Sequence, residues 1–255
     1  MIDTHCHLTD PRLYSQLEPV ISRAAASGVS HLITIGTDLE DDQQAVAVCE
    51  GRDAIRCAIG IHPNNCAQSQ VTDLDLLRPL APSPSVIALG EMGLDYHYPP
   101  IDRQRQTIFF ETQLALATER DLPVVIHCRE AVEDTLAILK GFPKVRGVFH
   151  CFMGTATEAK RILDAGYYLG FTGPVTFKKS DELRTVARFA PAARLLVETD
   201  SPYLSPEPMR GQKVNEPALV MHVAKRIAGE RGITVEELDE MTTANASQLF
   251  GWPRS

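Results

Sequence analysis

The first residues of the chain place two imidazoles one position apart, at His5 and His7. If this apolar start forms a β-strand, both side chains point to the same face, because side chains along a strand alternate with a period of two. Two neutral imidazole nitrogens on one face make half of a metal site. Two surface histidines would give the same pattern, so the pair gains meaning only if further ligands follow later strands.

Residues that bind metals recur after later apolar runs of the sequence. Buried His, Glu and Asp side chains are unfavourable unless they are paired or bound to a metal. We therefore predict a metal centre formed by six residues, namely His5, His7, Glu91, His127, His150 and Asp200. His62, which precedes Pro63, is predicted to line the pocket and hold substrate, with a plain loop histidine as the alternative. Asp95 lies in a Gly-Leu-Asp-Tyr turn and is expected to hydrogen-bond its own loop.

Short apolar runs that alternate with amphipathic segments predict the elements that must position these residues. The amphipathic segments predict helices at 14–27, 41–50, 131–139, 155–165 and 181–189, and another after Asp102. The apolar runs are typical of buried parallel strands, and they lie at 2–7, 30–35, 54–59, 86–89, 123–126, 147–150, 168–171 and 194–197.

Eight such strands with helices between them predict an α/β fold, a (β/α)8 barrel that forms a single domain over residues 1–255. Two or three helices within 216–252 are expected to close it. A doubly wound open sheet is the alternative, although the sequence has neither a Gly-x-Gly-x-x-Gly motif after a strand nor a P-loop. In a barrel, the carboxyl ends of the strands carry the active site.

The composition limits the possible partners. The 255 residues carry a net charge of −8, which argues against a broad basic surface for nucleic acid but allows a nucleic-acid substrate held through metal ions. No apolar run approaches the roughly 20 residues that span a bilayer, and no signal peptide precedes the first strand. We therefore expect a cytoplasmic protein without membrane contact, and no obligate protein partner is evident.

The 6 cysteines show no Cys-x-x-Cys spacing and are predicted to be reduced packing residues.

A few side chains at the predicted barrel mouth could bind an anionic substrate. Arg129 follows the fifth predicted strand, Lys178 follows the seventh, and Arg210 lies in a Pro-rich segment after the eighth. Tyr203 opens the long stretch 203–215, which is typical of an active-site loop and makes Tyr203 a predicted substrate contact. Each charged residue could equally be a solvated surface group.

The motifs at these positions resemble the TatD family of metal-dependent hydrolases, within the amidohydrolase superfamily. The resemblance extends from Ile2 to about Asn245, and its most specific motif is Thr-Asp-Ser-Pro-Tyr at 199–203. The other motifs are Asp-Thr-His-Cys-His at 3–7, Gly-Ile-His-Pro at 60–63, Gly-Glu-Met-Gly-Leu-Asp-Tyr at 90–96, His-Cys-Arg at 127–129 and His-Cys-Phe at 150–152.

The resemblance implies two divalent ions at the mouth of a barrel, with Glu91 bridging them. His5, His7 and Asp200 would hold one ion, and His127 and His150 the other. Magnesium or manganese is expected, and zinc is plausible because imidazole suits it. Members of the family include deoxyribonucleases, among them 3′-to-5′ exonucleases on single-stranded DNA. Val214 stands where many members carry an extra basic residue, which weakens the case for strong phosphate binding by that loop.

The leading hypothesis is therefore a phosphodiester-cleaving nuclease that acts on single-stranded DNA or another phosphodiester. Glu91 and Asp200 are its predicted catalytic residues, and Asp200 would take a proton from the attacking water. The same centre could instead hydrolyse a carboxylic ester, an amide, a lactone or an aminoacyl-tRNA, since activity does not follow from family membership alone. A metal-dependent binding module without activity is the third hypothesis.

Overall fold

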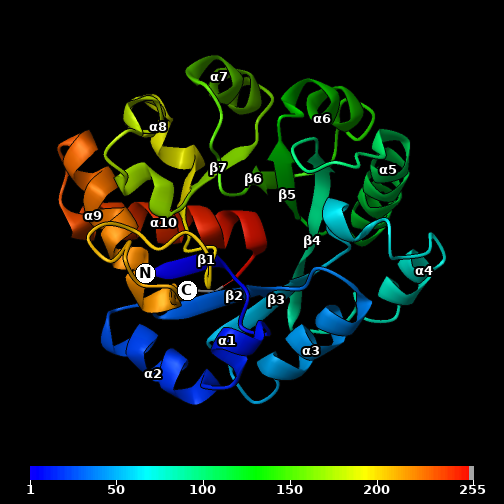
Figure 1. The fold of residues 1–255 in the computed structure, drawn as a ribbon, viewed down its shortest axis with the longest axis horizontal. Coiled ribbons are helices and arrows are strands. Elements are labelled where there is room, and N and C mark those ends of the chain that lie inside the picture. The colour runs from blue at the N-terminus through cyan, green and yellow to red at the C-terminus, as the bar shows by residue number, and fades with distance from the viewer. Residues whose placement is uncertain (253–255) are drawn as a thin grey trace.

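The chain forms one eight-stranded parallel sheet whose spatial order follows the sequence, from β1 to β8. The computed structural model describes residues 1–252. Helices surround the strands on the outside (Figure 1). All eight strands lie where the sequence predicts them: β1 Ile2–Cys6, β2 His31–Ile35, β3 Ile55–Ile59, β4 Val86–Asp95, β5 Val124–Arg129, β6 Gly147–Phe149, β7 Tyr168–Phe171 and β8 Leu195–Val197.

The segment after β8 closes the sheet against β1. The amide of Asp200 donates to the carbonyl of His5 at 2.9 Å, and the amide of His7 donates to the carbonyl of Ser201 at 2.8 Å. Cys6 and Ser201 form an isolated parallel bridge. Because the first and last strands meet, the predicted (β/α)8 barrel is confirmed and the doubly wound open sheet is wrong.

The helices follow the predicted pattern, and several begin at a side-chain cap. The side chains of Asp38, Asp102, Thr155 and Thr234 each accept a hydrogen bond from the first turn of the helix that follows. No helix within residues 1–252 is long and apolar enough to cross a membrane. The helices are α1 Pro11–Tyr14, α2 Leu17–Ala26, α3 Leu39–Cys49, α4 Asp73–Leu77, α5 Arg103–Arg120, α6 Val132–Leu139, α7 Ala156–Asp164, α8 Asp181–Phe189, α9 Val220–Arg231 and α10 Val235–Phe250.

Three differences from the sequence prediction concern the elements. The short helices α1 and α4 were not predicted, and β4 continues six residues beyond the predicted end at Leu89. Gly90 ended the predicted run, but there the chain passes so close to β5 that a Cβ atom would lie 2.4 Å from the carbonyl oxygen of Val125. Beyond it, β4 pairs with β5 again from Met92 to Asp95. This extension matters because it holds Glu91 in the sheet.

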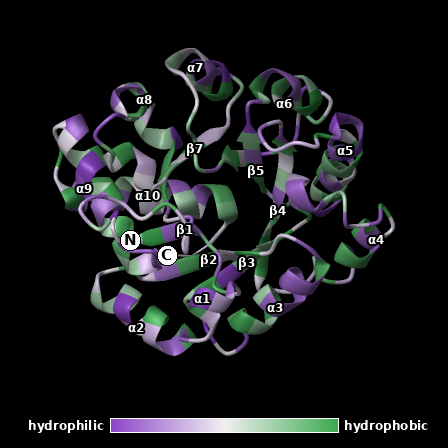
Figure 2. Ribbon diagram, viewed as in Figure 1, coloured by the Kyte–Doolittle hydropathy of each residue, from purple (hydrophilic) through white to green (hydrophobic). Residues whose placement is uncertain are grey.

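The barrel interior below the mouth is aliphatic. It contains Ile33, Ile35, Ala58, Val125 and Leu196, all fully buried. Leu249 and Phe250 of α10 pack against the same cluster, so the C-terminal helix covers one end of the barrel, as predicted. Figure 2 shows hydrophobic colour along the central strands, whereas the surrounding helices carry both colours. The six cysteines are free thiols in the structure, and their reduced state stays a prediction from the sequence.

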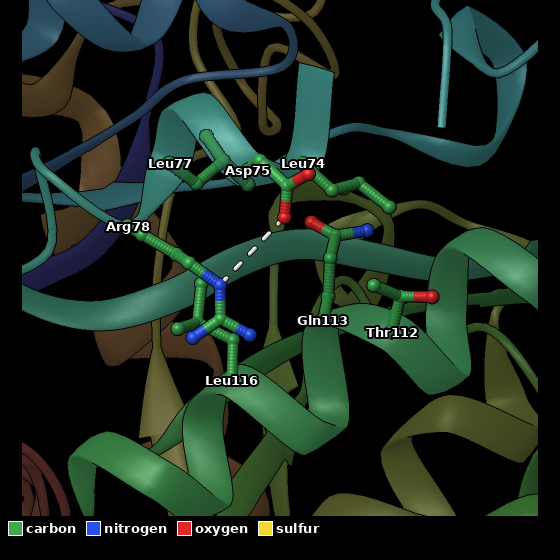
Figure 3. A pocket seen from close by; sticks show the side chains of 7 residues that line it. All are labelled: Leu74, Asp75, Leu77, Arg78, Thr112, Gln113 and Leu116. Atoms are coloured by element: carbon green, nitrogen blue, oxygen red, sulfur yellow. Dashed lines mark ion pairs between the residues drawn. The ribbon is translucent and has the colours of Figure 1, made fainter. Parts of the chain in front are cut away.

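A small cavity lies outside the barrel, between α4 and α5 (Figure 3). Its volume is about 10 Å³, which is room for roughly one water molecule. The Gln113 side chain on its wall is already committed, because it accepts a hydrogen bond from the amide of Ile61 at 2.8 Å and donates to the Ile61 carbonyl at 3.2 Å. This region therefore supports the β3 loop and is no candidate for a substrate site.

Candidate metal centre

Glu91 stands at the centre of the barrel mouth and is only 3% exposed. One of its carboxylate oxygens, Oε1, lies 2.7 Å from Nδ1 of His127 and 2.7 Å from Nε2 of His150. The same oxygen lies 3.3 Å from Nε2 of His62. These three histidines come from the ends of β5 and β6 and from the loop after β3, so one carboxylate oxygen on β4 contacts side chains from strands on both sides of it.

The second carboxylate oxygen of Glu91 faces the other side of the mouth. Oε2 lies 3.4 Å from Nε2 of His5 and 4.0 Å from Nε2 of His7. Asp200 completes this side, with Oδ1 at 3.4 Å from His7 Nε2 and 3.6 Å from His5 Nε2. The structure thus brings together all six predicted ligands around Glu91, whose two oxygens face different histidines.

The chemistry of this donor set fits divalent cations. Ring nitrogens of neighbouring histidines lie close to one another. Nε2 of His5 is 3.3 Å from Nε2 of His7, and Nδ1 of His127 is 3.3 Å from Nε2 of His150. Nitrogen lone pairs and carboxylate oxygens that converge in this way are ligands suited to zinc, manganese or related ions. Three overlapping groups have ligand atoms within 4.8 Å of one another: His5, His7, Asp200; His5, Glu91, His150; and His62, Glu91, His127.

Asp95 orients one histidine of the cluster. Its Oδ2 lies 3.0 Å from Nε2 of His127, and its Oδ1 accepts a hydrogen bond from the amide of His97 at 2.9 Å. The expected bond to its own loop is present, but the contact with His127 was not predicted. The strand alternation contained the signal, because Glu91 and Asp95 are four residues apart on β4 and therefore share a face. A carboxylate behind a metal-binding histidine fixes the orientation of its ring.

Glu198 stands in a similar place behind His150, and sequence reasoning missed it. Its Oε1 lies 3.8 Å from Nδ1 of His150, a buried nitrogen that has no hydrogen-bond partner. The carboxylate accepts hydrogen bonds from the amide of Cys151 and from the Thr4 hydroxyl. Gly170 makes room for it, since a Cβ atom there would lie 2.6 Å from the Glu198 carboxyl carbon.

The pKa shifts differ among the members of the cluster. Burial alone would raise the pKa of Glu91, but the nearby His150 and His62 hold that pKa well below its usual range. Burial likewise opposes ionisation of Asp200, yet its hydrogen bond with His7 leaves the pKa of Asp200 below normal. Burial lowers the pKa of His5 to about 4. At neutral pH both carboxylates are therefore ionised, and His5 is neutral and able to act as a ligand.

The predicted substrate residues occupy different places around this cluster. His62 lies inside it, next to Glu91, rather than beside it. Arg129 is half-buried at the end of β5, and Tyr203 is exposed with its ring centroid 6.0 Å from that of His7. The other two predicted residues are exposed on neighbouring loops: Lys178 after β7, and Arg210 beyond β8, where it lies 3.9 Å from Glu207.

A parallel barrel that gathers histidines and carboxylates at the carboxyl ends of its strands defines a class of protein, the barrel-shaped metal-dependent hydrolases. Within that class, a family model described as TatD related DNase matches residues 2–251. The chain belongs to the TatD family of metal-dependent hydrolases, and the resemblance inferred from its motifs is confirmed.

Individual relatives match over nearly their whole length. The chain is 41% identical over 252 residues to the uncharacterized metal-dependent hydrolase YabD of Bacillus subtilis, covering 98% of each chain. It is 38% identical over 257 residues to the 3′-5′ ssDNA/RNA exonuclease TatD of Citrobacter koseri, covering 98% of this chain and 99% of the relative. The crystal structure of YjjV, a TatD homologue from Escherichia coli, superposes with a TM-score of 0.94 at 30% identity, covering 99% of this chain and 98% of YjjV.

Proposed function

We propose that this protein is a phosphodiester-cleaving deoxyribonuclease that removes nucleotides from the 3′ end of single-stranded DNA with the help of two divalent ions. The observation that carries the proposal is the position of Glu91, one oxygen of which faces His5 while the other faces His127 and His150. One ion would be held by His5, His7 and Asp200, and the other by His127 and His150, with Glu91 shared. The relative from Citrobacter koseri, named as a 3′-5′ ssDNA/RNA exonuclease, supports the substrate class.

Magnesium or manganese is the proposed pair of ions, and zinc is also compatible with five neighbouring imidazoles. Ions bound there would polarise the phosphoryl group and lower the pKa of the attacking water toward about 7. Binding of an acidic polymer through cations also reconciles the substrate with the net charge of −8. The location in the cytoplasm stays a prediction from the sequence.

The residues of the chain have distinct tasks in the proposed reaction. Asp200 is ionised at neutral pH, so it accepts the proton of the attacking water and later returns it to the leaving oxygen. Glu91 would contact both ions, and Asp95 orients the ring of His127. Positive side chains on the surrounding loops neutralise the phosphate oxygens that do not react, and these are Arg129, Lys178 and Arg210.

The decisive experiment compares Asp200→Asn with the wild type after chelation and reloading with magnesium, manganese or zinc. End-labelled single-stranded DNA should shorten from its 3′ end with the wild type. The variant should keep bound metal but lose about 10²- to 10⁴-fold in turnover, the usual contribution of a positioned general base. Asp164→Asn, an exposed aspartate on α7, is the matched control. Turnover near the wild-type value in Asp200→Asn would remove the proton-transfer role.

Other substrates are separated in the same assay series. Aryl esters, lactones, amides and an aminoacyl-tRNA are offered to the same reloaded enzyme. Cleavage of one of these without cleavage of DNA would replace the nuclease by the alternative hydrolase. No turnover on any substrate would favour a binding module.

The number of ions is tested separately from activity. The double substitution of His5→Ala with His7→Ala removes two of the ligands proposed for one ion. Elemental analysis should show about two ions per chain in the wild type and about one in this variant. An unchanged metal content would show that these histidines do not hold an ion.

A further inference from the structure

Two arginine–tyrosine stacks stand at the rim of the barrel mouth. The guanidinium of Arg12 lies 4.6 Å from the ring centroid of Tyr203, and that of Arg129 lies 4.7 Å from the ring centroid of Tyr98. Both rings remain open to solvent, with Tyr203 48% and Tyr98 56% exposed. We call these pairs the Tyr203 stack and the Tyr98 stack.

The order of the strands places the two stacks on opposite sides of the mouth. Arg12 follows β1 and Tyr203 follows β8, which are neighbours in the closed barrel. Tyr98 follows β4 and Arg129 ends β5. In a barrel of eight strands that run in order from β1 to β8, these two strand pairs are half a turn apart, as Figure 1 also shows. The cluster around Glu91 therefore lies between the stacks.

The Tyr203 stack is held in place by a carboxylate, and both stacks are connected to the cluster. Asp10 binds Arg12 at 2.7 Å, and its Oδ2 also lies 3.5 Å from the Tyr203 hydroxyl, so one carboxylate fixes both members of the Tyr203 stack. The Tyr203 ring in turn contacts His7 edge to face, with centroids 6.0 Å apart. On the other side, Arg129 pairs in the sheet with Asp95, the residue that orients His127.

Exposure distinguishes these stacks from a pair with a structural role. Arg194 also lies over a tyrosine, Tyr168, but that ring is only 4% exposed and belongs to the aliphatic cluster of the barrel. The rings of the two rim stacks have no comparable partner in the core. Each combines a flat aromatic surface with a guanidinium group. Aromatic surfaces and positive groups of this kind bind unpaired nucleobases and their phosphates with little regard to sequence.

We propose that the Tyr203 stack and the Tyr98 stack hold the two bases that flank the scissile phosphodiester, one on each side, so that a single strand crosses the mouth between them. The inference rests on the proposed nuclease function and adds the way in which the substrate is held. It predicts a preference for single strands, because the bases of a duplex are already stacked and paired. It also assigns Arg12 and Tyr98, which the sequence did not single out, to substrate binding.

A double-mutant cycle between protein and substrate tests this arrangement. The variants Tyr203→Ala and Tyr98→Ala are assayed on a trinucleotide and on two analogues, which lack the base on the 5′ side or on the 3′ side of the scissile bond. Each variant should lose about tenfold in kcat/KM on the intact strand, the effect of removing one base–aromatic stack. That loss should disappear for one variant on the first analogue and for the other variant on the second.

Two further variants separate stacking from a loss of structure. Tyr203→Phe keeps the ring and removes only the hydroxyl beside Asp10, so the coupling between position 203 and its base should persist, because stacking depends on the ring. Tyr14→Ala removes an exposed tyrosine of α1 that belongs to neither stack and should show no coupling to either base. The Kd of the same oligonucleotides, measured by fluorescence anisotropy in the metal-loaded Asp200→Asn background, should show the same pattern of coupling.

The outcomes separate this inference from the proposed function. Equal losses on the intact strand and both analogues, or coupling of both tyrosines to the same base, would overturn the arrangement while the enzyme remained a nuclease. If the wild type cleaves no oligonucleotide, the proposed function fails, and the anisotropy measurement still tests the stacks. Oligonucleotide binding that shows no coupling between either tyrosine and either base would then also reject the two stacks as base-binding sites.

Discussion

The two ends of the barrel interior are made by the same strands but differ completely in chemistry. On β5, Val125 lies in the aliphatic cluster, and His127, two residues further along, reaches Glu91 at the mouth. Val148 and His150 repeat this relation at β6. Two residues correspond to about 7 Å along a strand and return to the same face. The change from an aliphatic interior to a cluster of ionisable groups therefore takes place within two residues of the same strand.

The residues that stabilise the barrel and the residues that could bind metal lie at different depths of the same barrel interior. The aliphatic layer gains free energy by removing apolar surface from water. The cluster above it places ionisable groups in a buried position, which is favourable only when they are paired or bind a cation. Substitutions in the two layers should therefore change different properties.

The largest effect is expected from Glu91→Gln. A carboxamide replaces one of the two oxygens that face the histidines, and the shared charge is lost. We expect kcat/KM to fall about 10³-fold or more, because the variant removes a group that would contact both ions of the proposed centre. Glu111→Gln, an exposed glutamate of α5, is the control. A kcat/KM near the wild-type value would show that the centre does not depend on the charge of Glu91.

The opposite result is expected from Leu196→Ala in the aliphatic layer. Leu196 is fully buried, and its truncation leaves a cavity. The expected loss in the free energy of unfolding is about 2–5 kcal/mol. The metal content of the folded variant, measured by elemental analysis, should equal that of the wild type. Loss of an ion from the folded variant would contradict the separation by depth.

Asp42 is a buried carboxyl outside the cluster around Glu91, and its substitution tests whether a buried carboxyl elsewhere affects metal binding. It lies on α3, accepts a hydrogen bond from the amide of Gly60 at 2.9 Å, and has a second oxygen without a partner. Burial raises the pKa of Asp42 well above its usual value. Between the unfolded and the folded pKa, the folded protein holds a proton that the unfolded chain has released, so stability falls as pH rises.

Asp42→Asn removes this proton and keeps the acceptor for Gly60. We expect the variant to gain stability relative to the wild type as pH rises, by at most about 1.4 kcal/mol per pH unit. Urea unfolding of the two proteins at pH 5 and pH 7 measures the gain. A difference in stability that is independent of pH would show that Asp42 is ionised in the folded protein. Metal content should not change in either case.

The smallest effect is expected from Glu198→Gln behind His150. The amide keeps the shape and an acceptor for Cys151, but it cannot ionise, whereas burial raises the pKa of the Glu198 carboxyl to about 7 and leaves it able to carry a negative charge near the ring. Outer carboxylates of this kind contribute about 10- to 100-fold to metal affinity. We expect the lower end of that range, because the 3.8 Å separation from His150 is longer than a hydrogen bond. Calorimetric titration with manganese measures it, and unchanged affinity would limit Glu198 to packing against Gly170.

Much of the fold and the ligand set could be predicted from the sequence, for reasons that are local. Apolar runs separated by helical segments predict parallel strands, and the period of two along a strand predicts that His5 and His7 share a face. Parallel strands in a barrel end at one rim, so His127, His150 and Asp200 could be expected to meet. The position of Glu91 inside a strand was not predicted, because Gly90 looked like the end of one.

Only the tertiary structure decided which partners stand behind and around these residues. The contact of Glu198 with Thr4 joins residues 194 positions apart, and it exists because the segment after β8 returns to β1. The placement of His62 against Glu91 depends likewise on the register of neighbouring strands. The sequence determined which side chains face inward, since that depends on the local pleat. Closure of the barrel decided which of them meet, because distances across it depend on the strand order and register.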